Sequence, residues 1–172
     1  EASRKFGFGA RITMNLAKRL YEAGYITYMR TDGIDMAPEA VGDARSAIEG
    51  RYGKQYVPDS PRIYKNKAKN AQEAHECIRP TEMDRAPADL KVTDEDQRKL
   101  YDLIWKRTLA SQMASARMER TTVTVGSDDK QVELRATGQV VLFDGFMRVY
   151  EEGRDDVQDE DDKRLPQIAQ GE

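Results

Sequence analysis

Apolar residues recur at helical spacing in three parts of the chain, and this pattern predicts three α-helices. The helices are expected over residues 10–23, 38–50 and 94–113. The apolar stripe of the first is made of Ile12, Leu16, Leu20 and Tyr21. Gly24 stands where a left-handed C-terminal cap is expected, and Pro38 suits the first turn of the second helix. Thr93 followed by Asp96 resembles a capping arrangement for the third.

After the third predicted helix the apolar period changes to two, which indicates β-strands. The alternating residues are Thr121, Val123 and Val125, and then Val132, Leu134 and Ala136. Residues 127–130 form the expected turn between them, and residues 140–150 form a third strand region interrupted at Asp144. Because three strands are too few to close on themselves, we expect this β unit to belong to a larger domain completed elsewhere in a longer chain.

The change of period near Ser115 predicts a boundary between residues 1–114, a helical domain, and residues 115–172, a partial β-rich domain. The expected fold class is α+β, mainly α, with a small antiparallel β unit. Between the helices, residues 54–80 read as an irregular loop that carries a run of cations. The acidic residues 151–164 read as a solvated loop.

One short segment between the first two helices combines β-branched and aromatic residues. Residues 25–29 lie between Gly24 and the turn-like sequence at residues 31–33, so we predict a short strand with Tyr28 at its outgoing end. We expect Tyr21 and Tyr25 to be core residues. Considered without further information, Tyr28 itself reads as a packed strand aromatic.

Composition narrows the class of protein. Hydrophobic residues make up 38% and charged residues 34% of the chain, which fits a folded protein, and no apolar run approaches the length of a membrane helix. A single cysteine, Cys77, excludes an intramolecular disulfide and fits a reducing compartment, so we expect a cytoplasmic protein and no membrane partner. The start at Glu1 resembles neither a signal peptide nor a native initiator, which suggests an internal piece of a longer chain.

The charge is unevenly distributed along the chain. Residues 1–109 hold 20 Lys and Arg against 17 Asp and Glu, whereas residues 110–172 hold 8 against 14. A surface that binds nucleic acid is therefore expected on the first part, since phosphate contacts need cations.

Several kinds of site are excluded by the sequence. A phosphate-binding loop for ATP is absent, the one histidine, His75, rules out a multi-histidine zinc site, and no D-x-D-x-E cluster suggests bound magnesium. No metal ligand is predicted in this chain.

Two motifs carry a resemblance to a known family. The sequence YITYMRTD at residues 25–32 is similar to the active-site tyrosine motif of the bacterial type IA DNA topoisomerases. The sequence QEAHECIRPT at residues 72–81 is similar to a second signature of that family. The methionine at position 29 favours the topoisomerase I branch, because the topoisomerase III branch usually has proline there. The similarity covers nearly the whole chain.

The resemblance implies an enzyme that relaxes negatively supercoiled DNA by cutting one strand, passing another through and resealing it. Tyr28 would attack a backbone phosphorus and become joined to the 5′ end of the cut strand. Exchange of a phosphodiester for a tyrosyl phosphodiester is nearly energy-neutral, which agrees with the missing ATP loop. A free phenol is only about 0.1% ionised at pH 7, which corresponds to roughly 4 kcal/mol, so the nucleophile needs a proton acceptor or a nearby cation.

Arg30 is expected to supply that cation, because residues 28 and 30 of an extended strand point to the same side. Its guanidinium suits a phosphate whose charge grows in the transition state, and such a donor is typically worth about 3 kcal/mol. The resemblance implies that His75 binds or polarises the DNA backbone. Arg79 is a candidate phosphate contact. Asp32 would either orient Arg30 or cap the turn.

Contacts to single-stranded DNA are expected to reach the backbone rather than base edges, because a relaxing enzyme acts at many sequences. Lys65, Lys67 and Lys69 are candidates for these contacts, with solvated loop charge as the alternative.

In the family, the tyrosine domain is helical, resembles a helix-turn-helix arrangement and closes against a domain that binds Mg²⁺; the following strands resemble part of the arch that acts as a hinge. The resemblance implies that Mg²⁺ is bound by a domain outside this chain, and that the missing metal-binding and arch domains are its partners. We therefore expect the isolated chain not to relax DNA.

Two alternative functions for the chain stay open. A winged-helix DNA-binding module would also combine helices with a small sheet, but neither residues 38–50 nor residues 94–113 show a convincing recognition helix. A structural or protein-interaction domain would leave both motifs unexplained and would show no salt-dependent binding to oligonucleotides.

Overall fold

The computed structural model describes residues 1–64, 76–127 and 131–151 of the chain. The chain divides into two compact units. The first comprises Glu1–Ala114 and the described part of Phe146–Gly153, and the described part of the second lies within Ser115–Gly145. Helices dominate the first unit and a two-stranded antiparallel sheet the second, so the predicted α+β, mainly α class is confirmed.

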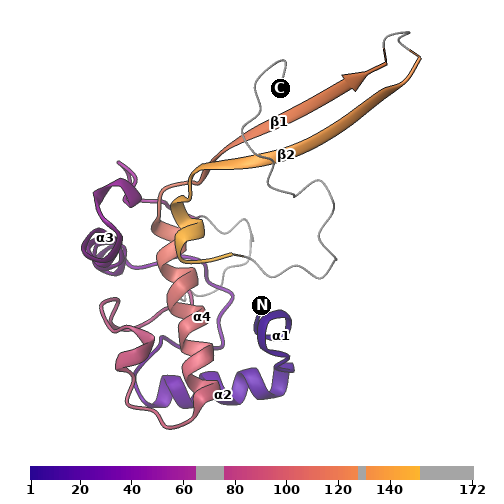
Figure 1. The fold of residues 1–172 in the computed structure, drawn as a ribbon. Helices are drawn as coiled ribbons and strands as arrows, with labels where there is room; N and C mark the ends of the chain where they lie inside the picture. Colours follow the sequence, from indigo (N-terminus) through magenta and orange to yellow (C-terminus); the bar gives the residue numbers. More distant parts are fainter. Residues whose placement is uncertain (65–75, 128–130, 152–172) are drawn as a thin grey trace. The chain divides into compact units, whose positions relative to one another are not determined.

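The described part of the first unit contains four α-helices (Figure 1). They are α1 (Ala2–Phe6), α2 (Ala10–Glu22), α3 (Pro38–Tyr52) and α4 (Glu95–Gln112). The short 3-10 helices are η1 (Lys54–Tyr56), η2 (Pro87–Asp89) and η3 (Gly145–Arg148). The three helices predicted from periodicity are confirmed as α2, α3 and α4. Each observed helix end lies within two residues of the predicted end. Within the described residues, no helix is long and apolar enough to span a membrane.

The end of α2 reverses the chain direction. Gly24 takes a left-handed conformation with φ of 76°, and its N–H donates to the Tyr21 carbonyl at 2.9 Å. The next N–H, that of Tyr25, donates to the Leu20 carbonyl at 2.9 Å. These two bonds form a Schellman cap, which satisfies two of the last carbonyls of the helix.

The buried face of α2 is narrower than predicted. Leu16, Ala17 and Leu20 are buried, but Ile12 is 51% exposed and Tyr21 is 42% exposed. Tyr21 lies about 140° around the helix from Leu16 and beyond Ala17, which places it at the edge of the buried face. Ile12 lies near the N-terminal end of α2, whereas the ion pair between Arg19 and Asp94 lies near its C-terminal end. The expectation that Tyr21 is a core residue is therefore wrong.

The start of α4 is capped by a different residue from the one predicted. The Asp94 carboxylate accepts hydrogen bonds from the N–H groups of Asp96 and Gln97, at 3.0 and 3.4 Å. It also pairs with Arg19 of α2 at 2.6 Å. A carboxylate at the N-cap satisfies free N–H groups and interacts favourably with the helix dipole, so the predicted Thr93 cap is wrong.

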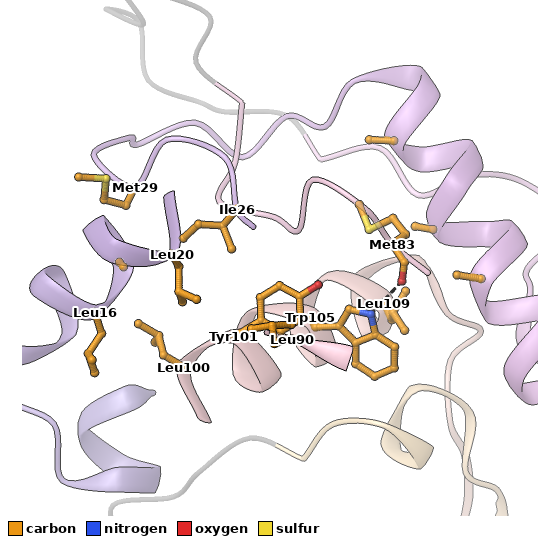
Figure 2. Packing of buried hydrophobic residues seen from close by; sticks show 14 of the residues in the cluster. Leu16, Leu20, Ile26, Met29, Met83, Leu90, Leu100, Tyr101, Trp105 and Leu109 are labelled. Carbon is orange, nitrogen blue, oxygen red and sulfur yellow. Dashed lines mark hydrogen bonds between the residues drawn. The ribbon is translucent and has the colours of Figure 1, made fainter. Parts of the chain in front are cut away.

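The core of the first unit lies between α2, α3 and α4 (Figure 2). Its most deeply buried large side chains include Leu20, Ile26, Ile48, Tyr101, Leu109 and Met113. Two aromatic side chains also make polar contacts there: the Trp105 indole N–H donates to the Met83 carbonyl at 2.9 Å, and the Tyr101 hydroxyl donates to the Arg85 carbonyl at 2.8 Å. Burial raises the pKa of Tyr101 to about 12.

The second unit is a β-hairpin of β1 (Arg117–Gly126) and β2 (Glu133–Phe143), visible as the long ribbon in Figure 1. The strands are antiparallel, with Thr121 opposite Gly138. The predicted third strand is wrong: residues 140–143 belong to β2, and the positive φ of Gly145, 51°, leads into η3. Several apolar side chains of the hairpin are exposed, among them Val125, Val132, Leu134 and Leu142.

Candidate active site around Tyr28

The segment that carries Tyr28 follows the Schellman cap of α2 and runs beside the second motif. Ile26 forms an isolated antiparallel bridge with Pro80. The Thr27 N–H donates to the Arg79 carbonyl at 2.9 Å, and the Thr81 N–H donates to the Tyr25 carbonyl at 3.0 Å. The predicted strand over residues 25–29 is wrong: within the described residues only Ile26 pairs, because the Arg79 N–H that would extend the ladder is bonded to the Thr27 hydroxyl instead of to its carbonyl.

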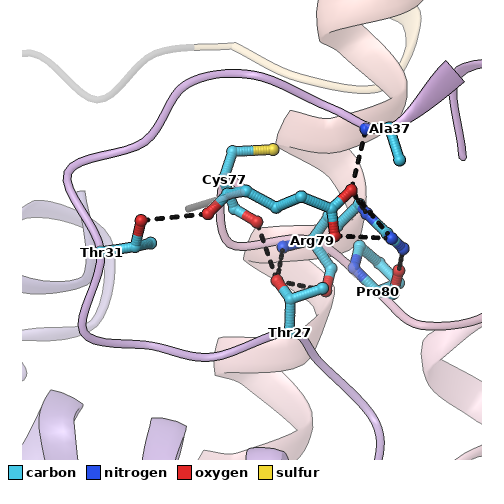
Figure 3. A network of polar contacts seen from close by, with 7 residues as sticks. Thr27, Thr31, Ala37, Cys77, Arg79 and Pro80 are labelled. Carbon is cyan, nitrogen blue, oxygen red and sulfur yellow. Dashed lines mark hydrogen bonds and ion pairs between the residues drawn. The ribbon is translucent and has the colours of Figure 1, made fainter. Parts of the chain in front are cut away.

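The Thr27 side chain joins the two motifs (Figure 3). Its hydroxyl donates to the Cys77 carbonyl at 2.8 Å and accepts the N–H of Arg79 at 2.9 Å. One hydroxyl thus acts as donor and acceptor for residues of the second motif, in place of further strand pairing.

Glu76 joins the second motif to the residues that precede α3. Its carboxylate accepts the N–H of Ala37 at 2.8 Å and two guanidinium nitrogens of Arg79, at 2.9 Å from Nη2 and 3.2 Å from Nε. The Glu76 carbonyl accepts the Thr31 hydroxyl at 3.0 Å. Partial burial by itself would raise the pKa of Glu76, but the bonds from Arg79 and Ala37 outweigh it and hold that pKa below its usual value.

Tyr28 lies on the surface with a buried neighbour. Its side chain is 43% exposed, whereas Met29 is 9% exposed and belongs to the core, and Arg30 is exposed again. The alternation means that Met29 anchors the segment while Tyr28 and Arg30 both face solvent. Within the described parts of the chain, the Arg30 guanidinium forms no hydrogen bond or ion pair, so its donors are open to a ligand.

The turn after Tyr28 is held by Thr31. The Thr31 hydroxyl accepts the Gly33 N–H at 2.9 Å, in addition to its bond to Glu76. Asp32 is exposed beside it. The proposed role of Asp32 stays a prediction.

Arg79 is engaged inside the protein. Besides its bonds to Glu76, its Nη1 donates to the Pro80 carbonyl at 3.0 Å, and its side chain is 14% exposed. The structure therefore gives Arg79 a role in holding the two motifs together, and a direct phosphate contact stays a prediction. Beside it, burial raises the pKa of the Cys77 thiol.

The remaining predicted site residues lie outside the described residues. These are His75, Lys65, Lys67 and Lys69. Among the described residues, no group of three or more His, Cys, Asp or Glu side chains is arranged to hold a metal ion.

Three residues of this region were not singled out from the sequence: Thr27, Glu76 and Tyr21. Thr27 lies within the first motif and Glu76 within the second, and the motifs were the only sign in the sequence that these residues matter. Hydrogen bonds between the two segments produce no periodic pattern in the sequence that could have predicted them. The Tyr21 ring meets the Tyr28 ring edge-on, with centroids 5.3 Å apart and an interplanar angle of 70°.

Comparisons with known proteins identify the family to which the chain is similar. The family model of DNA topoisomerase matches residues 1–172. The chain is 55% identical to DNA topoisomerase 1 of Zymomonas mobilis, over 100% of this chain and 14% of that protein. It is 51% identical to DNA topoisomerase 1 of Streptomyces coelicolor, over 100% of this chain and 19% of that protein.

The fold matches that of a solved relative as well. Full-length topoisomerase I from Thermotoga maritima aligns with a TM-score of 0.75 and 34% identity, covering 95% of this chain and 27% of that one. The chain thus spans between about a seventh and a quarter of the length of these relatives. On the match of the family model to every residue, the chain belongs to the DNA topoisomerase family, in its bacterial type IA topoisomerase I branch.

Proposed function

We propose that this chain is the tyrosine-bearing segment of an ATP-independent enzyme that relaxes negatively supercoiled DNA. The Tyr28 hydroxyl attacks a backbone phosphorus of a single-stranded segment. The bond from phosphorus to the 3′ oxygen breaks, Tyr28 becomes joined to the 5′ end, and the leaving oxygen takes a proton to become a 3′ hydroxyl. Passage of another strand is followed by the reverse reaction.

The observation that carries the proposal is the exposure of Tyr28 on an otherwise anchored segment. A nucleophile must reach a phosphate in solution, and it must also be held in place. Met29 supplies a core anchor beside it, and the Thr27 hydroxyl ties the segment to the second motif.

Arg30 is proposed to bind the attacked phosphate. Its exposed guanidinium has no ion pair in the described residues, and a guanidinium fork matches the phosphate oxygens. His75, Lys65, Lys67 and Lys69 are proposed to contact the DNA backbone, with Asp32 and Arg79 supporting the site. Of these, Arg79 would act through Glu76 and Thr27, since its donors are engaged there.

Mg²⁺ would be bound by another part of the full-length enzyme. A partner domain is also required to hold the DNA strand and accept the phenolic proton. We therefore predict that the purified chain, incubated with supercoiled plasmid and Mg²⁺, leaves the plasmid supercoiled. Relaxation by this chain alone would show that the site is complete within these residues.

The function is tested in the full-length parent enzyme with single-stranded oligonucleotides labelled at the 5′ or the 3′ end. After denaturation, covalent adducts are compared for wild type, Tyr28→Phe and the matched control Tyr64→Phe. Tyr64 is 45% exposed, close to the 43% of Tyr28, and its hydroxyl donates to the Ser111 carbonyl. Wild type and the control should carry the 3′-labelled product, whose 5′ end is bonded to protein, and Tyr28→Phe should carry none.

An enzyme that binds the oligonucleotide but forms no adduct would contradict the proposal and favour a DNA-binding module without catalysis. An adduct that carries the 5′ label would contradict the assigned polarity. An adduct that survives in Tyr28→Phe would contradict the choice of tyrosine.

A further inference from the structure

We infer that Tyr21 is a positioning residue for the Tyr28 nucleophile, acting through the contact between the two rings. The inference rests on the proposed function, because it concerns the orientation of the same phenol. It assigns a role to a tyrosine that is exposed, although its place in α2 suggested a core residue.

The geometry of the pair is suited to this role. The centroids lie 5.3 Å apart with the planes inclined at 70°, which is the edge-to-face arrangement that aromatic pairs prefer. Neither ring is deeply buried: Tyr21 is 42% exposed and Tyr28 is 43% exposed. Because much of each ring is open to solvent, the contact between the two rings contributes to holding the Tyr28 ring in one orientation.

Tyr21 is itself held firmly. It lies in the last turn of α2, and its carbonyl accepts the Gly24 N–H in the Schellman cap. The same cap turns the chain so that Tyr28, seven residues later, returns to the Tyr21 ring. A rigid helix end thus provides one side of the contact, and the segment anchored by Met29 provides the other.

The Tyr28 hydroxyl forms no hydrogen bond to any described residue. The edge-to-face contact with Tyr21 is therefore a direct constraint on rotation of the Tyr28 ring. A reacting oxygen must be oriented toward the phosphorus, and loss of orientation lowers the rate of attack. An aromatic pair is worth enough to change the population of the oriented ring by roughly 3- to 10-fold.

The experiment uses the full-length parent enzyme carrying Tyr21→Leu or Tyr21→Phe. Leucine favours the helix and keeps an apolar side chain but removes the ring, whereas phenylalanine keeps the ring and removes only the hydroxyl. Single-turnover adduct formation is measured at saturating oligonucleotide. The dissociation constant is measured separately in the uncleaving Tyr28→Phe background, and thermal unfolding checks that each variant is folded.

The inference predicts that Tyr21→Leu forms adduct roughly 3- to 10-fold more slowly at saturation, with an unchanged dissociation constant, and that Tyr21→Phe restores the wild-type rate. A rate for Tyr21→Leu equal to wild type would overturn it. Weaker binding with an unchanged saturated rate would overturn it in favour of base stacking on Tyr21. Equal loss in Tyr21→Phe would assign the effect to the hydroxyl and also overturn it.

Failure of the proposed function gives a different result. In that case the wild-type enzyme itself forms no Tyr28-dependent adduct, whatever occupies position 21.

Discussion

Removal of the Thr27 hydroxyl should weaken both the fold and the candidate site. Thr27→Val keeps nearly the same shape but leaves the Arg79 N–H and the Cys77 carbonyl without the partners that the hydroxyl provides at 2.9 and 2.8 Å. An unpaired, partly buried N–H costs roughly 1–3 kcal/mol, and a lost ordinary hydrogen bond about 1 kcal/mol. Because this region is only partly buried and water can replace some of the loss, we expect the free energy of unfolding to fall by about 2 kcal/mol.

Urea unfolding of the chain measures this change. Trp105 is the single tryptophan and is 5% exposed, so its fluorescence reports the unfolding of the helical unit. With a urea slope of about 2 kcal/mol per molar, the midpoint should fall by about 1 M. Thr27→Ser is the matched control, since it keeps the hydroxyl and loses only a methyl group.

The same pair of variants tests the link to chemistry in the full-length enzyme. Thr27→Val should form adduct more slowly than Thr27→Ser, because the segment before Tyr28 loses its tie to the second motif. If Thr27→Val unfolds at the same urea concentration as wild type and forms adduct at the same rate, the hydroxyl does not hold the two motifs together and the reasoning is refuted.

Further predictions concern the stability of the fold and its pH dependence. Gly24→Ala should destabilise the chain by about 1–2 kcal/mol, because alanine is strained at the left-handed φ although nothing lies within 4 Å of an added Cβ. Gly42→Ala, equally unobstructed inside α3, should stabilise it by up to about 1 kcal/mol; urea unfolding that ranks the two variants the other way would contradict this. Glu76→Gln should destabilise the chain at neutral pH, and the difference from wild type in unfolding free energy should shrink as the pH falls through the lowered pKa of Glu76; a constant difference would contradict it. Tyr101, with its pKa raised to about 12, stabilises the fold fully below pH 10 and loses this contribution as the pH rises toward 12, so Tyr101→Phe should flatten alkaline unfolding curves relative to wild type.

Helices were predictable because burial on one face leaves a period in the sequence. Leu16 and Leu20 fixed the position of α2, and Gly24 marked its end correctly. The width of the buried face was not predictable, because it depends on where α4 packs, and so Tyr21 was wrongly placed in the core. The N-cap of α4 was placed one residue too early, since both Thr93 and Asp94 are side chains that can cap a helix.

The segment around Tyr28 shows why composition alone misplaced a strand. β-branched and aromatic residues favour extended backbone, but a strand also needs a partner with free N–H and carbonyl groups. Here the Thr27 hydroxyl accepts the Arg79 N–H that would extend the pairing, and it donates to the Cys77 carbonyl, 50 residues away in the sequence. The two motifs predicted the location of the candidate site from the sequence. The hydrogen bonds that join them and the ring contact between Tyr21 and Tyr28 could be seen only in the structure.

The most direct test of the central claim is to identify the residue that carries the DNA. The full-length enzyme is trapped on a 3′-labelled oligonucleotide, treated with nuclease and trypsin, and analysed by fragment-ion mass spectrometry. Residues 20–30 form one tryptic peptide, and it contains Tyr21, Tyr25 and Tyr28, so the fragment ions must separate them. We predict a nucleotide 5′-phosphate on Tyr28 alone. A modification on Tyr21, on Tyr25 or on a residue outside this peptide would contradict the assignment of Tyr28 as the nucleophile.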